Sequence, residues 1–354
     1  MENVDIIDPV TDSRWDKFVE NHPFGWIVHT SGWKRVLERN FPHMKGHYLV
    51  LQDSSTNEIQ AGLPLFEVRS WLTGNRLISI PFATISDPLV STGEQADSLL
   101  KAALNLSHKV GVDNIQIRTL NAHNILKNDE YVCDRHFVHH YLPLNGSIER
   151  IKKTFHYKAV QYEINKAIKS NMTFKIAEEE SDLVCFYELY MKTRKKLGLP
   201  PQPYLLFKSL WDIFSPTKNV MVLLAISNKK VASAHFMFLF NERVSVEAVG
   251  WDVENKDSPN HFLFWEGIKM SYGMGYRIYD FGRTARDNHN LINFKNRWGT
   301  TVVDLPFYFS PKSHHEKTVE LGNSAGYKLI QMLCKNSPDL FYPFIGRFCY
   351  RHLG

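Results

Sequence analysis

The first third of the chain has apolar residues at two spacings, one typical of helices and one typical of strands. Apolar positions three and four residues apart predict helices that begin near Ser13 and Thr30, and a longer helix over residues 94–110. Gly111 follows the longer helix, in the position where a glycine commonly ends one. Shorter runs rich in β-branched residues predict strands at residues 48–51, 59–69, 76–80 and 113–118.

The same order of elements returns in the second half of the chain. Strands are predicted at residues 220–225, 231–240 and 244–249. A helix over 258–274 follows, Gly275 ends it, and a further strand spans 276–281. Because strand, turn, strand, strand, helix, glycine and strand recur, we predict an α/β unit with mixed sheets that is used twice.

The segment between the repeats has a different character. Residues 121–147 are rich in Asn and His, and we interpret them as a linker. Residues 148–170 predict a cationic helical stretch, whose lysines we expect on a solvated face. Residues 171–220 predict one strand and two helices.

A dense group of polar and cationic residues begins where the strand 276–281 ends. Within eight positions the chain carries Asp280, Gly282, Arg283, Arg286 and Asp287. Such side chains at the end of a strand are typical of a site built on a rigid scaffold. An ordinary ion pair between Asp280 and Arg283 across a turn is the alternative interpretation.

Two further elements are predicted after this group. Lys295, Arg297 and Trp298 belong to a short helix. Residues 300–306 then predict an edge strand that Pro306 ends, because proline lacks the N–H group that a central strand needs.

Several motifs of this chain resemble those of one transferase family. Three motifs resemble the C-terminal signature of the FemAB-like transferases, namely Tyr279-Asp-Phe-Gly-Arg283, Asn293-Phe-Lys295 and Arg297-Trp-Gly299. Further motifs in the family's order are His29-Thr-Ser-Gly-Trp33, Lys166-Ala-Ile-Lys169 and Lys195-Lys-Leu-Gly198. The branch associated with bacterial exopolysaccharide and PEP-CTERM surface-protein systems is the most similar. The resemblance spans residues 10–310.

The resemblance implies tandem GNAT-like domains, the fold of the acyl-CoA N-acyltransferases. We therefore expect an N-terminal GNAT-like domain over residues 1–145 and a C-terminal one, carrying the transfer site, over residues 146–312. A helical tail is expected over residues 313–354. In such a domain neighbouring strands splay apart, and the freed backbone N–H groups hold an acyl carbonyl as it becomes an oxyanion.

Composition and charge narrow the classes of function. The chain has 354 residues, of which 44% are hydrophobic, so it can bury two cores and is not disordered. Its formal net charge of +5 is too small to predict DNA binding, but it suits an anionic substrate. The four cysteines have no C-x-x-C spacing, so we expect reduced thiols, no metal site and a cytoplasmic protein. The sequence shows no signal peptide and no apolar run of membrane-spanning length.

Three residues are candidates for catalysis. Glu247 lies in an apolar strand, where burial would raise the pKa of its carboxyl toward that of a working base, although simple alternation would point it at solvent. Asp280, at a strand end, is expected either to orient the incoming amine or only to anchor Arg283. By resemblance, Lys295 polarises the ester carbonyl of the donor or holds the charge of the leaving group. The alternative for Lys295 is a surface lysine on a short helix.

Six further residues are candidates for binding the substrate or the donor. They are Arg283, Arg286, Phe294, Trp298, Lys34 and Arg194. The two arginines near the strand end are forked donors suited to phosphate or carboxylate. The resemblance places the acyl ester of the donor near Phe294. By resemblance to cell-wall members of the family, Lys34 and either Arg194 or a neighbouring lysine would grip the diphosphate of a nucleotide-linked acceptor.

These features predict an acyl- or aminoacyltransferase that forms an amide on an amino-sugar or peptide acceptor in cell-envelope, peptidoglycan or exopolysaccharide synthesis. No cofactor is expected to remain bound, and the donor substrate is acyl-CoA or aminoacyl-tRNA. The helical arm that cell-wall members insert for tRNA has no room in residues 171–220. The alternative is an inert module that binds anionic glycans or lipid-linked sugars, because the tail 339–351 mixes aromatic residues with arginine. Such a tail could contact the inner face of a membrane, and the alternative is that it packs on the second domain.

Overall fold

The computed structural model describes residues 4–112, 114–311 and 325–352. The chain forms two compact units, each made of more than one segment of the sequence. Unit 1 consists of Met1–His136, Asp304–Leu329 and Arg347–Gly354. Unit 2 consists of Phe137–Val303 and Ile330–Gly346.

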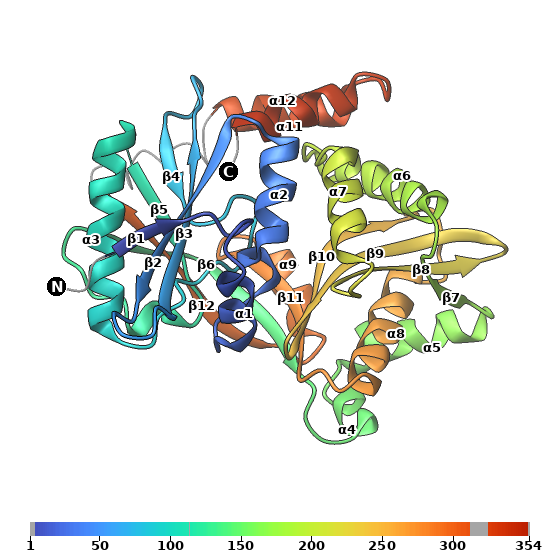
Figure 1. Ribbon diagram of the computed structural model, residues 1–354. Coiled ribbons are helices and arrows are strands. Elements are labelled where there is room, and N and C mark those ends of the chain that lie inside the picture. Colours follow the sequence, from blue (N-terminus) through green and yellow to red (C-terminus); the bar gives the residue numbers. More distant parts are fainter. Residues whose placement is uncertain (1–3, 113, 312–324, 353–354) are drawn as a thin grey trace. The chain divides into compact units, whose positions relative to one another are not determined.

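Unit 1 contains a mixed sheet with helices on both faces (Figure 1). Its strands, in spatial order, are β1 (Val4–Ile7), β2 (Met44–Gln52), β3 (Ile59–Val68), β4 (Arg76–Ile78), β5 (Asn114–Arg118) and β12 (Thr301–Ser310). Neighbouring strands are antiparallel except β4 and β5, which run parallel. The helices are α1 (Arg14–Asn21), α2 (Ser31–Asn40) and α3 (Gly93–Val110).

Alternation along β2 explains the two helical layers of unit 1. Tyr48 packs against Trp15 of α1, with 5.1 Å between the ring centroids. The next residue, Leu49, joins the apolar cluster that includes Leu99 of α3. Because successive side chains of a strand point to opposite faces, α1 and α3 cover opposite faces of the sheet.

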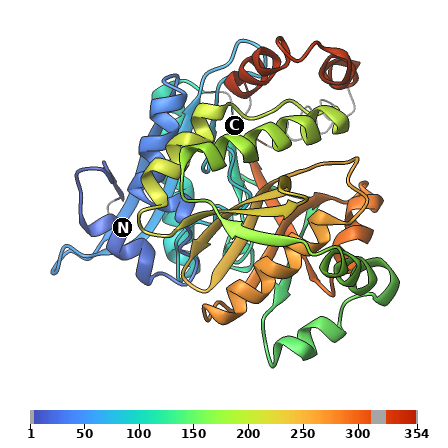
Figure 2. The same cartoon turned by 90° about the vertical axis from the view of Figure 1, so that its right-hand side faces the viewer.

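Unit 2 repeats this plan (Figure 2). Its strands, in spatial order, are β6 (Val132–Pro143), β11 (Ile278–Ala285), β10 (Arg243–Trp251), β9 (Lys230–Phe240), β8 (Val220–Ser227) and β7 (Thr173–Ile176). The parallel neighbours here are β10 and β11. One face of the sheet is covered by α5 (Tyr162–Lys169) and α8 (Pro259–Gly273), and the other by α6 (Glu180–Leu197) and α7 (Tyr204–Phe214).

Four further helices complete the described chain. They are α4 (Ile148–Lys153), α9 (His289–Asn296), α11 (Ala325–Asn336) and α12 (Tyr342–His352). Short 3₁₀ turns lie at Ile27–His29 and Ala122–Asn124, and a π-helical turn at Tyr157–Gln161 leads into α5. Among the described residues, none of the helices has both the length and the apolar character needed to cross a bilayer.

The predicted duplication is confirmed by the topology. The order β2, β3, β4, α3, β5 in unit 1 corresponds to β8, β9, β10, α8, β11 in unit 2. Gly111 and Gly275 follow the two helices in the left-handed conformation, with φ of +65° and +85°. The strand beside β5 is β12, and the strand beside β11 is β6, so each sheet is completed by a strand from the other half of the sequence. The units are therefore not contiguous segments, unlike the domains expected over residues 1–145 and 146–312.

Two predictions of secondary structure are wrong. Residues 121–147, interpreted as a linker, contain β6. Local composition does not reveal this strand, because its pairing partner β11 is distant in sequence. Pro306 does not end the strand predicted over residues 300–306, since β12 continues to Ser310. Proline lacks only the donor, and the Pro306 carbonyl accepts a hydrogen bond from the Thr119 N–H (3.0 Å).

Other expectations about the second half hold. Residues 171–220 form one strand and two helices, namely β7, α6 and α7. The expected tail helices are present as α11 and α12, while residues 312–324 of the expected tail lie outside the described residues.

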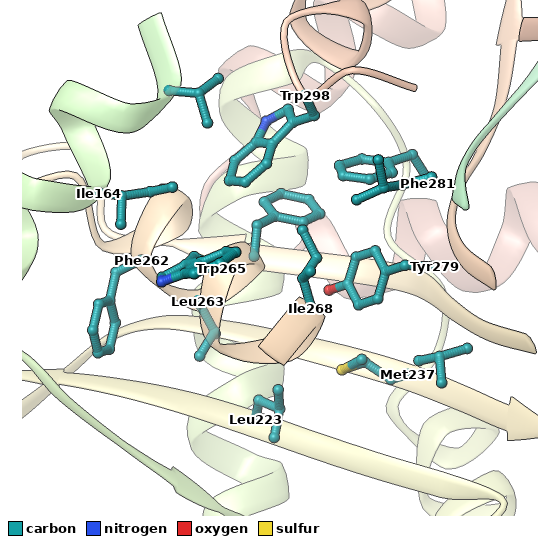
Figure 3. Packing of buried hydrophobic residues seen from close by; sticks show 14 of the residues in the cluster. Ile164, Leu223, Met237, Phe262, Leu263, Trp265, Ile268, Tyr279, Phe281 and Trp298 are labelled. Atoms are coloured by element: carbon teal, nitrogen blue, oxygen red, sulfur yellow. The ribbon is translucent and has the colours of Figure 1, made fainter. Parts of the chain in front are cut away.

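The core of unit 2 lies between its sheet and α8 (Figure 3). Phe262 and Trp265 of α8 belong to the same buried cluster as Tyr279 and Phe281 of β11. Trp298 completes the cluster and is 0% exposed. This packing fixes the positions of β11 and of the chain that follows α9.

Helix α6 packs closely against β10 at Gly250. A Cβ atom at Gly250 would lie 2.4 Å from the backbone nitrogen of Tyr190 and 2.6 Å from the carbonyl carbon of Leu189. We expect Gly250→Ala to destabilise the fold by about 1–3 kcal/mol, because α6 must move to admit the methyl group. Chemical denaturation measures this difference.

Gly273, in the last turn of α8, provides the matched control. Apart from its two chain neighbours and the backbone of its own helix, no atom of the described residues lies within 4 Å of its Cβ position. Alanine favours a helix over glycine by up to about 1 kcal/mol. Gly273→Ala should therefore leave stability unchanged or raise it. Equal stability of the two variants would contradict the close packing of α6 on β10.

Candidate functional site

The parallel strands β10 and β11 pair over only three residue positions. The pairs are Arg243 with Ile278, Val244 with Tyr279 and Ser245 with Asp280. Beyond them, within the described residues, β10 continues to pair with β9 and β11 with β6, but not with each other. The two strands thus separate as the family resemblance implies, and beyond Ser245 and Asp280 their facing backbone edges do not pair with each other.

Unit 1 differs at the corresponding place. After the last pair of β4 and β5, the Ser79 N–H donates to the Gln116 carbonyl (2.8 Å). The Ser79 hydroxyl also accepts from the Arg118 N–H (2.9 Å). These hydrogen bonds bridge β5 and the chain after β4, so the candidate site is in unit 2.

Glu247 occupies a bulge in β10 beside this opening. Val246 pairs with Met237 and Ala248 with Phe236, so Glu247 is the extra residue. Bulges commonly re-aim a side chain next to a functional site. The Glu247 carboxylate accepts a hydrogen bond from Ser245 Oγ (2.6 Å). Burial raises the pKa of Glu247 to about 7, with nearby Asp280 acting in the same direction.

Lys295 of α9 reaches the end of β11. Its Nζ donates to the carbonyls of Gly282 (2.9 Å) and Arg283 (3.0 Å). Its side chain is buried, with an exposed fraction of 6% for the residue, so the surface-lysine alternative is wrong. Burial lowers the pKa of the Lys295 ammonium to about 7, although Asp280 and Glu247 favour its charged form.

Asp280 is a fully buried carboxylate at the last position where β11 pairs with β10. Its Oδ2 accepts from Arg243 Nη1 (2.6 Å) and lies 2.9 Å from His139 Nε2, while its Oδ1 accepts from the Gly282 N–H (2.6 Å). Burial opposes ionisation, but His139, Arg243 and the Gly282 N–H outweigh it and hold the pKa of Asp280 below its ordinary value. The carboxylate therefore joins β6, β10 and β11 at the point where β10 and β11 separate.

Sequence reasoning missed two of these partners. His139 lies in β6, inside the segment interpreted as a linker, and Arg243 begins β10. A buried carboxylate requires a matching charge, so the prediction of Asp280 as a strand-end residue implied a partner. The identity of that partner depends on strand pairing between residues that are 141 positions apart.

The remaining candidates near α9 have different environments. Arg283 and Arg286 are exposed, and the Arg283 guanidinium lies 5.1 Å from the centre of the Phe137 ring. Phe294 is half-buried and contacts the His261 ring. The indole of Trp298 is fully buried and packs against the core, so its position supports α9 and gives it no exposed surface for a donor.

Lys34 and Arg194 already have partners. Lys34 belongs to unit 1, where Nζ lies 2.9 Å from a carboxylate oxygen of Glu38 and 3.4 Å from one of Asp8. Arg194 of α6, in unit 2, donates through Nε (3.2 Å) and Nη2 (2.8 Å) to the Pro200 carbonyl, at the loop after the helix. Their role in binding a diphosphate stays a prediction. To bind one, Lys34 and Arg194 would have to give up these contacts.

The network around Asp280 generates a prediction for stability. Asp280→Asn removes the negative charge and leaves Arg243 and His139 without their ionised partner. Breaking a buried ion pair by removing one member commonly costs about 3–5 kcal/mol. We expect a loss of this size in the free energy of unfolding, measured by chemical denaturation.

Asp339→Asn is the matched control, because Asp339 also forms an ion pair, with Lys195, but its side chain is 94% exposed. Exposed pairs contribute at most about 1 kcal/mol. A similar small loss for both variants would show that Asp280 is not the anchor of the strand ends.

Comparison with known proteins agrees with this geometry. Residues 155–295 match the sequence model of the acetyltransferase (GNAT) domain. The matched segment contains β10, β11 and Lys295. No curated protein sequence matches this chain.

Solved structures with the same fold cover nearly the whole chain. The crystal structure of FemX has 15% sequence identity and a TM-score of 0.70, covering 90% of this chain and 100% of its own. The structure of L-PGS from Bacillus licheniformis has 11% identity and a TM-score of 0.58, covering 94% and 100%. A tandem GNAT protein from the clavulanic acid biosynthesis pathway has 11% identity and a TM-score of 0.51, covering 87% and 98%.

At these sequence identities the solved structures show the fold alone. The family model adds that residues 155–295 resemble an acetyltransferase (GNAT) domain. The expected resemblance to FemAB-like proteins and the expected tandem GNAT fold are thus confirmed. Residues 155–295 match the model of the acetyltransferase (GNAT) domain, and this match, together with the FemAB-like fold, identifies the protein as an acyltransferase.

Proposed function

We propose that unit 2 transfers an acyl or aminoacyl group from an activated donor to an amine, forming an amide on an amino-sugar or peptide acceptor of cell-envelope or exopolysaccharide synthesis. The observation that carries the proposal is the open end between β10 and β11, beside which a carboxyl and an ammonium group are both held near neutral pKa. This combination supports acyl transfer because the reaction needs a proton acceptor and a stabilised oxyanion at one carbon atom.

Lys295 supports the oxyanion part of this proposal. Two backbone carbonyls at the end of β11 hold its Nζ before any substrate binds. A carbonyl oxygen placed in the opening would meet this ammonium group and the backbone N–H groups of the separated strands. Preorganised donors of this kind lower the barrier to acyl transfer, since they need no rearrangement as negative charge develops.

Glu247 supports the proton-transfer part. In the reaction the amine nitrogen forms a bond to the carbonyl carbon, and the C–O or C–S bond of the donor breaks. The proton lost by the nitrogen passes to the Glu247 carboxylate and from there to the leaving alkoxide or thiolate. A pKa of about 7 suits both transfers, because the carboxylate accepts and returns the proton near neutral pH.

We assign Asp280 an anchoring role. Its side chain is fully buried, and its oxygens are already bonded to Arg243, His139 and the Gly282 N–H. Of the two roles expected from the sequence, orienting the amine would require an exposed oxygen. Anchoring requires only that the carboxylate hold the ends of the strands, and its partner is Arg243 and not the expected Arg283.

The beginning of α8 bears on the choice of donor. A diphosphate such as that of coenzyme A is favourably bound at a helix N-terminus, where backbone N–H groups and the helix dipole attract anions. The helix that follows β10 is α8, and the Ser258 hydroxyl at its start donates to the Glu163 carboxylate. A carboxylate is therefore already present where a diphosphate would bind.

The loop that leads into α8 adds further negative charge. It carries Asp252, Glu254 and Asp257, against one cation of its own, Lys256. The carboxylates are in excess and would repel a diphosphate. We therefore favour an aminoacyl ester over acyl-CoA as the donor, and a tRNA carrying it would have to bind without the helical arm for which residues 171–220 leave no room.

A donor assay tests the proposed function. The protein is incubated with radiolabelled acetyl-CoA or with a mixed pool of aminoacyl-tRNAs, together with amino-sugar and peptide amines. We expect label from the aminoacyl-tRNA pool in an amide product, and little or none from acetyl-CoA. Consumption of neither donor would refute acyl transfer and leave the binding-module alternative, whereas efficient use of acetyl-CoA would refute only our choice of donor.

The pH dependence of the rate tests the two residues. Glu247 must be deprotonated to accept a proton and Lys295 protonated to stabilise the oxyanion, and both have a pKa of about 7. We expect a bell-shaped profile centred near pH 7. Glu247→Gln should remove the acidic limb and lower kcat by about 10²–10⁴-fold, and Lys295→Met should remove the alkaline limb.

Exposed residues of the same types are the controls. Glu242→Gln, in the turn before β10, and Lys230→Met, at the start of β9, should leave the profile unchanged. A bell-shaped profile that survives in both Glu247→Gln and Lys295→Met would contradict these roles.

A further inference from the structure

Unit 1 exposes large apolar side chains at a place that acyl transfer does not use. Trp71 and Leu72, in the turn between β3 and β4, are 81% and 50% exposed, and Phe348 of α12 is 50% exposed. The other seven of the eight tryptophans are buried or half-buried. An exposed cluster of large apolar groups is typical of an interaction site.

Hydrogen bonds hold the Trp71 turn against the end of α12. Thr73 Oγ1 donates to the His352 carbonyl (2.8 Å), and Ser70 Oγ lies 2.9 Å from His352 Nδ1. The His352 ring also contacts the rings of Trp71 (5.4 Å) and Phe348 (5.0 Å). The turn and the helix end therefore form one ordered surface within unit 1.

The outward face of α12 combines aromatic and cationic side chains. Besides Pro343 in the first turn, its exposed residues recur three and four positions apart and are Phe344, Arg347, Phe348 and Arg351. The helix contains no Asp or Glu. We define the Trp71 surface as Trp71, Leu72, Arg347, Phe348 and Arg351, all in unit 1.

We propose that the Trp71 surface docks onto an anionic lipid bilayer. Trp71, Leu72 and Phe348 would enter the headgroup layer, where tryptophan is favoured because its ring is both apolar and polar. Arg347 and Arg351 would meet the negative headgroups, as in interfacial amphipathic helices with arginine beside aromatic residues.

Charge complementarity distinguishes this occupant from a second copy of the chain. The surface carries two arginines and no carboxylate of its own. The nearby Arg69 adds no uncompensated charge, since it pairs with Glu67. Two such surfaces facing each other would repel, whereas an anionic bilayer attracts both arginines.

Vesicle co-sedimentation of the full chain tests the proposal. One set of vesicles is pure phosphatidylcholine, and the other contains equal parts of phosphatidylcholine and phosphatidylglycerol. We expect binding to the anionic vesicles and much weaker binding to the neutral ones. Arg347→Gln and Arg351→Gln should each weaken binding about fivefold, the effect of one cation near an anionic surface. Lys229→Gln, in the exposed turn between β8 and β9, is the matched control and should have no effect.

Tryptophan fluorescence locates the contact. Brominated lipids quench a tryptophan that enters the bilayer, and Trp71 is the most exposed tryptophan of the chain. We expect quenching by brominated anionic vesicles that disappears in Trp71→Phe, while that variant still sediments with them and keeps its circular dichroism spectrum. Quenching that persists in Trp71→Phe, or equal binding to neutral and anionic vesicles, would overturn the proposal. So would concentration-dependent self-association that Trp71→Phe abolishes, because it would identify a second copy as the occupant.

Discussion

The buried carboxylate of Asp280 is the interaction on which the candidate site depends. An anion without solvent contact is tolerated only when its charge is matched, and Arg243, His139 and the Gly282 N–H match it. These partners lie on β10, β6 and β11, so one side chain joins three strands at the last pair before two of them separate. The end of the sheet where β10 and β11 separate is thus stabilised by the ionic contacts of Asp280 and by the buried apolar cluster that includes Trp298.

Two further ionisable groups in this region have pKa values shifted from their ordinary range. Burial disfavours the charged forms of both Glu247 and Lys295, which brings their pKa values to about 7 from opposite directions. A fold selected only for stability would avoid both side chains, since each departs from the rule that buried residues are apolar. Their presence beside the separated strands supports the roles proposed above, proton transfer for Glu247 and oxyanion stabilisation for Lys295.

The duplicated units have the same topology but do not have equivalent openings. In unit 2 the strands separate after Ser245 and Asp280, whereas Ser79 bridges the corresponding position in unit 1 through its N–H group and its hydroxyl. The exchange of β6 and β12 between the halves also gives unit 2 the histidine that Asp280 requires. The exchange thus supplies β6 and its His139 to the candidate transfer site of unit 2. Unit 1 instead carries the Trp71 surface.

Local patterns in the amino-acid sequence were sufficient for the repeated order of strands and helices and for the two glycines that follow α3 and α8. They also singled out Glu247 as a candidate, whereas Lys295 became a candidate only through the family resemblance. These features depend on residues a few positions apart, whose spacing shows which face an element buries. Local patterns did not reveal β6, the partners of Asp280, the burial of Trp298 or the two carboxylates that meet Lys34. Each of these depends on segments distant in sequence that meet when the sheet assembles, and periodicity carries no information about which neighbour a buried face will find.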